Sequence, residues 1–150
     1  MTATVDAPRA SAPWHFWLAS LVGILWNGFG AYDYWMSNTS GDVYLRSSGM
    51  SDAQIAYFHA MPAYMTGVWA VGVWGGLLGA ILMLARLRWA FPVFVASLAA
   101  FLASLVYYFV LTDGMKVNGQ RMVIMDAVIL AGCLFYVWYS RLMAKRGVLR

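Results

Sequence analysis

The sequence predicts an all-α membrane protein, a bundle of four membrane-spanning helices with a short helix on one membrane surface. Of its 150 residues, 63% are hydrophobic and only 11% are charged, whereas soluble domains carry about 25% charged residues. Four apolar blocks, residues 14–36, 63–84, 89–111 and 122–143, are each long enough to cross a bilayer core of about 30 Å as a helix. The alternation typical of barrel strands is absent, so helices remain the way to satisfy backbone groups in lipid.

The segments at both ends are predicted to lie outside the membrane. Residues 1–13 are rich in Ala, Pro, Ser and Thr, which predicts a disordered cytoplasmic tail. A cleaved signal peptide is the alternative, but the first apolar block exceeds the usual apolar region of about 7–15 residues and only Arg9 precedes it. The first span is therefore expected to be retained. Residues 144–150 form a basic tail that is expected to contact anionic lipid in the cytoplasmic leaflet.

The basic residues predict the orientation of the chain. If the N-terminus is cytoplasmic, three basic residues, Arg46, Lys116 and Arg121, lie on the outer side. The seven on the inner side are Arg9, Arg86, Arg88, Arg141, Lys145, Arg146 and Arg150. This excess places both termini in the cytoplasm, because cytoplasmic loops are enriched in Lys and Arg.

The outer loop at residues 37–62 is predicted to contain the short surface helix. Ser51 and Gln54 have the spacing of a capping box, in which each side chain satisfies a backbone N–H of the other residue. Ile55 and Phe58 lie three residues apart and therefore on one helical face. Pro62 suits the first turn of the second span.

The second and third spans carry small residues at intervals of four. The second span has Gly72, Gly76 and Ala80, and the third has Ala96, Ala100 and Ser104. Such spacing lets two helices approach closely. We therefore expect these two spans to pack tightly together. Pairing of a second small-residue face with another subunit is the alternative to packing within the chain, which is slightly favoured.

Several polar residues are predicted to gather near the outer interface. Asp33 lies roughly 28 Å along the helix from Trp14, and Asp126 lies only about 6 Å into the fourth span from the outer side. His59 and Arg121 belong to the same side. One interpretation is a set of interfacial ion pairs that orient the helices. The other is a polar vestibule that opens outward and binds a ligand.

Asn27 and three tryptophans lie deeper in the predicted bundle. The Asn27 amide must find hydrogen-bonding partners, and a bond to a neighbouring helix is favoured over a ligand contact. Trp26, Trp69 and Trp74 lie away from the usual interfacial belts. They either pack between helices or, with Asn27, form a flat pocket for a sugar ring or another planar ligand.

Catalytic and metal-binding patterns are missing. Cys133 is the only cysteine, which excludes an internal disulfide and a CxxC site. The only two histidines, His15 and His59, are expected at opposite membrane faces, so they cannot share a metal or haem. No nucleophile–base set or phosphate-binding loop stands out. We therefore expect no enzyme, no cofactor, no metal and no nucleic-acid partner.

Two stretches carry a resemblance to a known group. LWNGFGAYDYWM at residues 25–36 and PAYMTGVWAVGVWGGLLGAILMLARLRWAFPVFVASL at residues 62–98 resemble small four-helix bacterial inner-membrane proteins that are often described as sugar transporters. The resemblance covers most of the chain from residue 14 onward. It implies a bacterial inner-membrane location, with the outer surface facing the periplasm, and it implies no catalytic residues.

These patterns favour the transport or binding of a small, sugar-like solute. Four helices are few for alternating access, so this hypothesis requires a homo-oligomer. The expected ligand-binding residues are Asn27, Asp33, His59, Trp69, Trp74, Arg121 and Asp126. The alternative is an accessory, structural subunit that packs against a larger membrane complex. A membrane enzyme is the least favoured class, because no catalytic set is visible. Membrane lipids are expected partners in every case.

Overall fold

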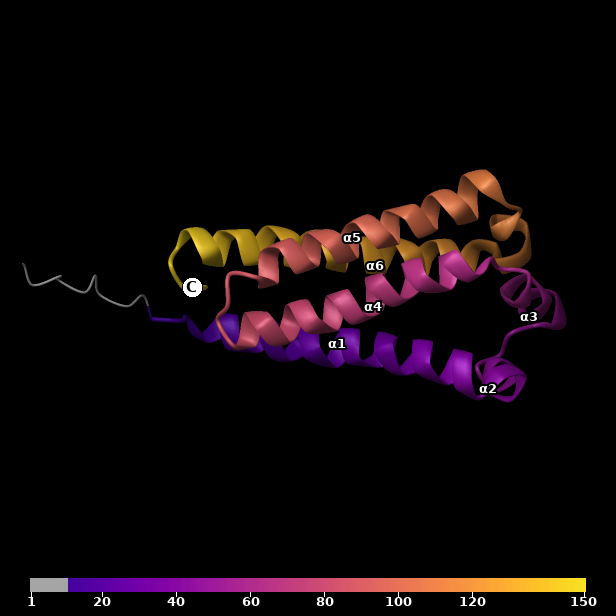
Figure 1. Ribbon diagram of the computed structural model, residues 1–150, viewed down its shortest axis with the longest axis horizontal. Coiled ribbons are helices and arrows are strands. Elements are labelled where there is room, and N and C mark those ends of the chain that lie inside the picture. Colours follow the sequence, from indigo (N-terminus) through magenta and orange to yellow (C-terminus); the bar gives the residue numbers. More distant parts are fainter. Residues whose placement is uncertain (1–10) are drawn as a thin grey trace, which may run out of the picture.

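The computed structural model describes residues 11–150, and within them every regular element is a helix. The elements are α1 (Trp14–Thr39), α2 (Gly41–Ser47), α3 (Asp52–His59), α4 (Ala63–Leu84), α5 (Ala90–Val106), the π-helical turn η1 (Tyr107–Leu111) and α6 (Gly114–Lys145). The four long helices run side by side, and α2 and α3 lie at one end of them (Figure 1). We call this end the capped end and the opposite end the tail end. The predicted disordered tail lies, for residues 1–10, outside the described residues.

Three helical segments are long and apolar enough to cross a membrane, which indicates a membrane protein. They are α4, the continuous segment Ala90–Leu111 and α6, with mean hydropathies of 1.9, 2.2 and 1.9. At most 22% of each apolar window is buried inside the protein, so most of these side chains are left for lipid. The fourth predicted span, α1, is long but does not reach this hydropathy, because glycines and polar residues such as Asn27 and Asp33 interrupt it.

The predicted spans agree with the helices to different degrees. The block at residues 63–84 coincides with α4, and the block at 89–111 matches α5 followed by η1. Helix α6 begins well before the predicted start at residue 122. However, Gly119 has φ 69° and ψ −174° inside it, so the regular helix that could span lipid starts only beyond this break.

Helices α4 and α5 pack closely, as the small residues predict. The Ser97 hydroxyl donates a hydrogen bond of 2.6 Å to the carbonyl oxygen of Gly72. A methyl group added at Gly75 would lie 3.3 Å from the Ser97 Cβ, and one at Gly79 would lie 2.8 Å from the Phe94 ring. The glycines of α4 therefore receive Ser97 and Phe94 of α5, rather than the predicted stripe of Ala96, Ala100 and Ser104.

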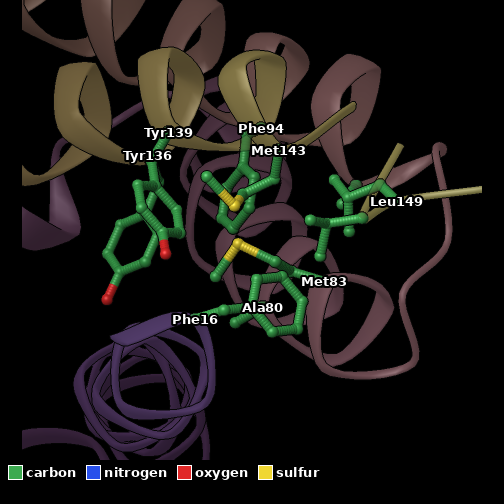
Figure 2. Close-up of a cluster of buried hydrophobic side chains, with 10 residues drawn as sticks. Phe16, Ala80, Met83, Phe94, Tyr136, Tyr139, Met143 and Leu149 are labelled. Atoms are coloured by element: carbon green, nitrogen blue, oxygen red, sulfur yellow. The ribbon is translucent and has the colours of Figure 1, made fainter. Parts of the chain in front are cut away.

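The main apolar core lies at the tail end (Figure 2). Phe94 of α5 stacks on Tyr136 of α6 with ring centroids 5.2 Å apart. The fully buried side chains around them include Phe16 of α1 and Met83 of α4. All four long helices thus contribute to this core, which fixes their arrangement at this end.

The chain after α6 turns back and pairs with the connection between α4 and α5. The Arg150 N–H donates to the Arg86 carbonyl at 2.8 Å, and the Arg88 N–H donates to the Arg150 carbonyl at 2.7 Å. The Arg86 guanidinium also donates to the Val148 carbonyl at 3.0 Å. Val148 and Leu149 are buried in the core. The segment predicted as a basic tail on lipid is therefore partly packed into the protein.

Candidate functional site at the capped end

Asp33 lies near the capped end of α1 and holds α2 in place. Its carboxylate accepts a hydrogen bond of 2.8 Å from the hydroxyl of Tyr44 on α2. The Tyr32 ring meets the Tyr44 ring edge-on, with centroids 6.3 Å apart. Burial, and after it the bond to Asp33, raises the pKa of Tyr44 above its usual value. The sequence did not predict α2, a helix of seven residues that is held by contacts with other helices.

His59 lies at the end of α3 and contacts α2. Its Nε2 atom is 2.6 Å from a carboxylate oxygen of Asp42. Both side chains are about half exposed, so the pair is accessible from outside the protein. Asp42 and Tyr44 are two residues apart on α2 and therefore point to different sides of it. One side of α2 binds α1 through Tyr44, and the other binds α3 through Asp42.

The start of α3 follows the predicted capping box. The Ser51 N–H donates to the Gln54 side-chain oxygen at 2.8 Å, and the Gln54 N–H donates to the Ser51 hydroxyl at 3.4 Å. This reciprocal pair satisfies backbone donors that an α-helix leaves free at its start. The predicted short helix is confirmed as α3 (Asp52–His59).

Trp69 of α4 joins these elements through aromatic contacts. Its ring meets the Tyr34 ring of α1 edge-on at a centroid distance of 4.8 Å, and the Phe58 ring of α3 edge-on at 6.1 Å. Four elements therefore converge at one place. We call it the polar–aromatic junction and define it by Asp33, Tyr34, Asp42, Tyr44, Phe58, His59 and Trp69. It brings together three of the predicted site residues, Asp33, His59 and Trp69.

The other side of α3 binds the connection between α5 and α6. The Tyr57 and Thr112 hydroxyls are 2.5 Å apart, and the Gln54 amide donates to the Asn118 side-chain oxygen at 3.5 Å. Gly114 packs against the Tyr57 side chain, since a methyl group added at Gly114 would be 2.9 Å from the Tyr57 hydroxyl oxygen. Helix α3 therefore bridges the α1–α2 side of the capped end and the α6 side.

Arg121 and Asp126 lie on α6, away from the junction. The Arg121 side chain is exposed and makes no hydrogen bond or ion pair within residues 11–150. Asp126 is partly buried and interacts electrostatically with Tyr108 of η1. The contacts of Asp33 and His59 go to α2 instead. Contacts among the described residues thus do not assemble the predicted vestibule of Asp33, Asp126, His59 and Arg121, and His59 pairs instead with Asp42.

Asn27 packs where α1 crosses α4. Its amide donates a hydrogen bond of 2.8 Å to the Gly23 carbonyl of its own helix. Its side-chain oxygen lies against Gly76, where an added methyl group would be only 2.1 Å away. The predicted bond to a neighbouring helix is therefore replaced by a bond within α1 and by close contact with a glycine.

The three deep tryptophans do not share a pocket. Trp69 belongs to the junction, whereas Trp26 lines a groove between α1 and α6. Trp74 is 44% exposed and, within residues 11–150, makes no ring contact with the other two. The predicted flat pocket of Trp26, Trp69, Trp74 and Asn27 is therefore not formed. Of the three, only Trp69 has ring contacts among residues 11–150, with Tyr34 and Phe58.

No metal-binding group of three or more His, Cys, Asp or Glu side chains is found among residues 11–150. The one cysteine, Cys133, is a free thiol on α6. Comparisons with protein-family models, with curated proteins and with solved structures returned no match.

Proposed function

We propose that α1 is a fourth membrane span, so that four helices cross a bacterial inner membrane. The side of α1 that faces away from α4 exposes a continuous apolar stripe of Leu18, Leu25 and Phe29, which are 53%, 75% and 69% exposed. These residues are spaced by seven and four, so they lie on one helical face that would suit lipid. The stretch from Trp14 to Asp33 is about 28 Å long, close to the thickness of the hydrocarbon core.

In this proposal the tail end faces the cytoplasm and the capped end faces the periplasm. The tail end carries Arg86 and Arg88 between α4 and α5, and Arg141, Lys145, Arg146 and Arg150 at or beyond the end of α6. Fewer basic residues lie near the capped end, namely Arg46, Lys116 and Arg121. This distribution supports cytoplasmic termini.

The capped end then binds a small polar solute with several hydroxyl groups, such as a sugar. The observation that carries this proposal is the position of Trp69 between Tyr34 and Phe58, with Asp33 and the Asp42–His59 pair on the adjoining elements. Binding sites for small molecules typically combine aromatic walls with a few placed polar groups. Carboxylates accept hydrogen bonds from hydroxyl groups, and aromatic rings contact the apolar face of a sugar ring.

Transport of such a solute would require more than one copy of the chain. Secondary transporters usually combine several repeats around a site near the middle of the membrane. In the single chain, the middle of the α1–α4 contact is occupied by Asn27 against Gly76. A homo-oligomer would supply the additional helices, and the junction would serve as its outward binding site.

Isothermal titration of the protein in lipid nanodiscs with a panel of monosaccharides and disaccharides tests the proposal. We expect saturable binding of at least one sugar, weakened about tenfold by Trp69→Phe and by Asp33→Asn. The matched controls are Trp138→Phe, which changes an exposed tryptophan of α6, and Asp52→Asn, which changes an exposed carboxylate paired with Arg46. Absence of binding, or equal weakening by the controls, would contradict the proposal.

An accessory role is the second candidate, and an open glycine on α4 favours it. Gly72 has no other atom within 4 Å of the position that a Cβ would take. A helix of another membrane protein could therefore approach closely there. Affinity purification from native membranes in mild detergent tests this role. Stoichiometric recovery of a larger complex, lost with Gly72→Leu, would support it over the solute-binding proposal.

A further inference from the structure

A groove separates α1 from α6 near the middle of the two helices. Its walls are Val22 and Trp26 of α1 and Val128, Ala131, Gly132 and Phe135 of α6, and its volume is about 370 Å³. All of these wall residues are apolar. The groove is therefore suited to a hydrocarbon occupant, since burying a polar group there would leave it without a hydrogen bond.

The floor of the groove is closed by a contact between the same two helices. The Tyr136 hydroxyl donates a hydrogen bond of 3.0 Å to the Ala19 carbonyl. The Tyr136 ring lies against Gly23, where an added methyl group would be 3.0 Å away. Nearer the tail end, a hydrogen bond of 2.6 Å between His15 and Tyr139 also joins α1 to α6. An occupant must therefore enter from the lipid side or from the capped end.

Arg121 lies on the same face of α6 as the groove, between the groove and the capped end. Arg121, Val128 and Phe135 are spaced by seven residues, so they lie nearly in line along the helix. The spacing puts Arg121 roughly 10 Å beyond Val128, toward the capped end. It is also about 30 Å from Arg141, so the two arginines lie near opposite membrane interfaces. Arg121 is exposed and makes no ion pair within residues 11–150.

We propose that this groove binds one phospholipid of the outer leaflet. One acyl chain lies between Trp26 and Phe135 and reaches down to Tyr136, and the phosphate group binds the Arg121 guanidinium. An apolar channel that ends in an exposed cation matches the two parts of a phospholipid. The inference rests on the proposed insertion of α1, but not on solute binding at the junction.

Native mass spectrometry of the detergent-purified protein, titrated with palmitoyl-oleoyl phosphatidylglycerol, tests the site. We expect one tightly bound lipid per chain. Gly132→Leu should weaken this binding at least about tenfold, because its side chain fills the groove, while the space around Gly132 allows the protein to fold. Arg121→Gln should weaken it about fivefold. A diacylglycerol with the same chains should bind to the wild type as weakly as the phospholipid binds to Arg121→Gln.

Two controls separate this site from general contact with lipid. Gly67→Leu adds the same bulk to an open position of α4, and Arg46→Gln removes a cation that is already paired with Asp52. Neither should change the affinity. Unchanged binding to Gly132→Leu would overturn the proposal. So would a wild-type dimer that Gly132→Leu converts to a monomer, since the occupant would then be a second copy. Sugar titration of the same samples shows separately whether the solute site is intact.

Discussion

The hydroxyl of Tyr44 donates a hydrogen bond to the carboxylate of Asp33 across 2.8 Å and joins α2 to the end of α1. Leu45, the next residue, is only 2% exposed and anchors the same short helix by burial. An isolated helix of seven residues would not be stable in water, because helix formation has a costly nucleus. Helix α2 therefore depends on these two contacts.

Replacing Tyr44 with Phe should loosen α2 while leaving the long helices in place. The substitution keeps the ring but removes the donor, and a partly exposed hydrogen bond to a carboxylate is worth about 1 kcal/mol. We expect the amides of Gly41–Ser47 to exchange with deuterium about fivefold faster. Tyr57→Phe is the matched control, since it should instead speed exchange in Asp52–His59. A uniform change across both helices would contradict the assignment of separate anchors.

The Tyr44 contact should also depend on pH in the alkaline range. The pKa of Tyr44 is raised above its usual value, first by burial and then by the bond to Asp33. The contact therefore contributes its full stability below about pH 10, the unfolded value, and loses it as the pH rises through the higher folded value. Thermal unfolding in detergent should show a difference between wild type and Tyr44→Phe that is constant from pH 7 to 9 and shrinks above about pH 10. A difference that grows with pH would reverse this sign and exclude the mechanism.

Gly76→Ala should destabilise the contact between α1 and α4. The added methyl group would lie 2.1 Å from the Asn27 side-chain oxygen, so Asn27 must move and lose its bond to Gly23. We expect a loss of about 1 to 3 kcal/mol in the free energy of unfolding in mixed micelles. Gly72→Ala, at an open position of the same helix, should be nearly neutral. The double variant Asn27→Ala/Gly76→Ala should recover part of the loss. If the losses of the two single variants simply added, the two residues would not be in contact.

Leu149→Ala should be costly although the residue lies almost at the end of the chain. Its side chain is only 1% exposed and packs in the tail-end core with Phe16, Met83 and Met143. Removing such a side chain costs about 2 to 5 kcal/mol. The matched control is Leu87→Ala in the facing connection, where the leucine is 41% exposed. Equal midpoints of thermal unfolding for the two variants would show that this end of the chain is not part of the core.

The sequence predicted those elements that depend on local patterns. Apolar length located α4, and the spacing of Ser51 and Gln54 located α3, because both signals lie within a few neighbouring residues. Helix α2 was missed because its stability comes from Tyr44 reaching a residue on another helix. The core position of Leu149 was missed for the same reason, since its partners are distant in sequence.

The predicted site residues were brought together only in part, and the reason is geometric. Membrane depth can be estimated from the helical rise, which predicts Asp33 and Asp126 at one level, with His59 and Arg121 on the same side. The depth of a residue along its helix does not determine which side of the bundle its side chain faces. Asp33 and His59 both contact α2, whereas Arg121 lies on the outer face of α6. Tyr34 belongs to the aromatic run around Asp33, which is a signal for it, whereas Asp42 and Tyr44 lie in the following loop and carry no such signal.

The break at Gly119 divides α6 into two mechanical parts. Its backbone, with φ 69° and ψ −174°, interrupts the helical hydrogen-bond ladder between Gly114 and the long segment that follows. The short piece before the break is tied to α3 through Asn118, and the long piece after it begins close to Arg121. If α3 tilts, the backbone at Gly119 can therefore rotate, so that the short piece of α6 follows α3 while the long piece keeps its position.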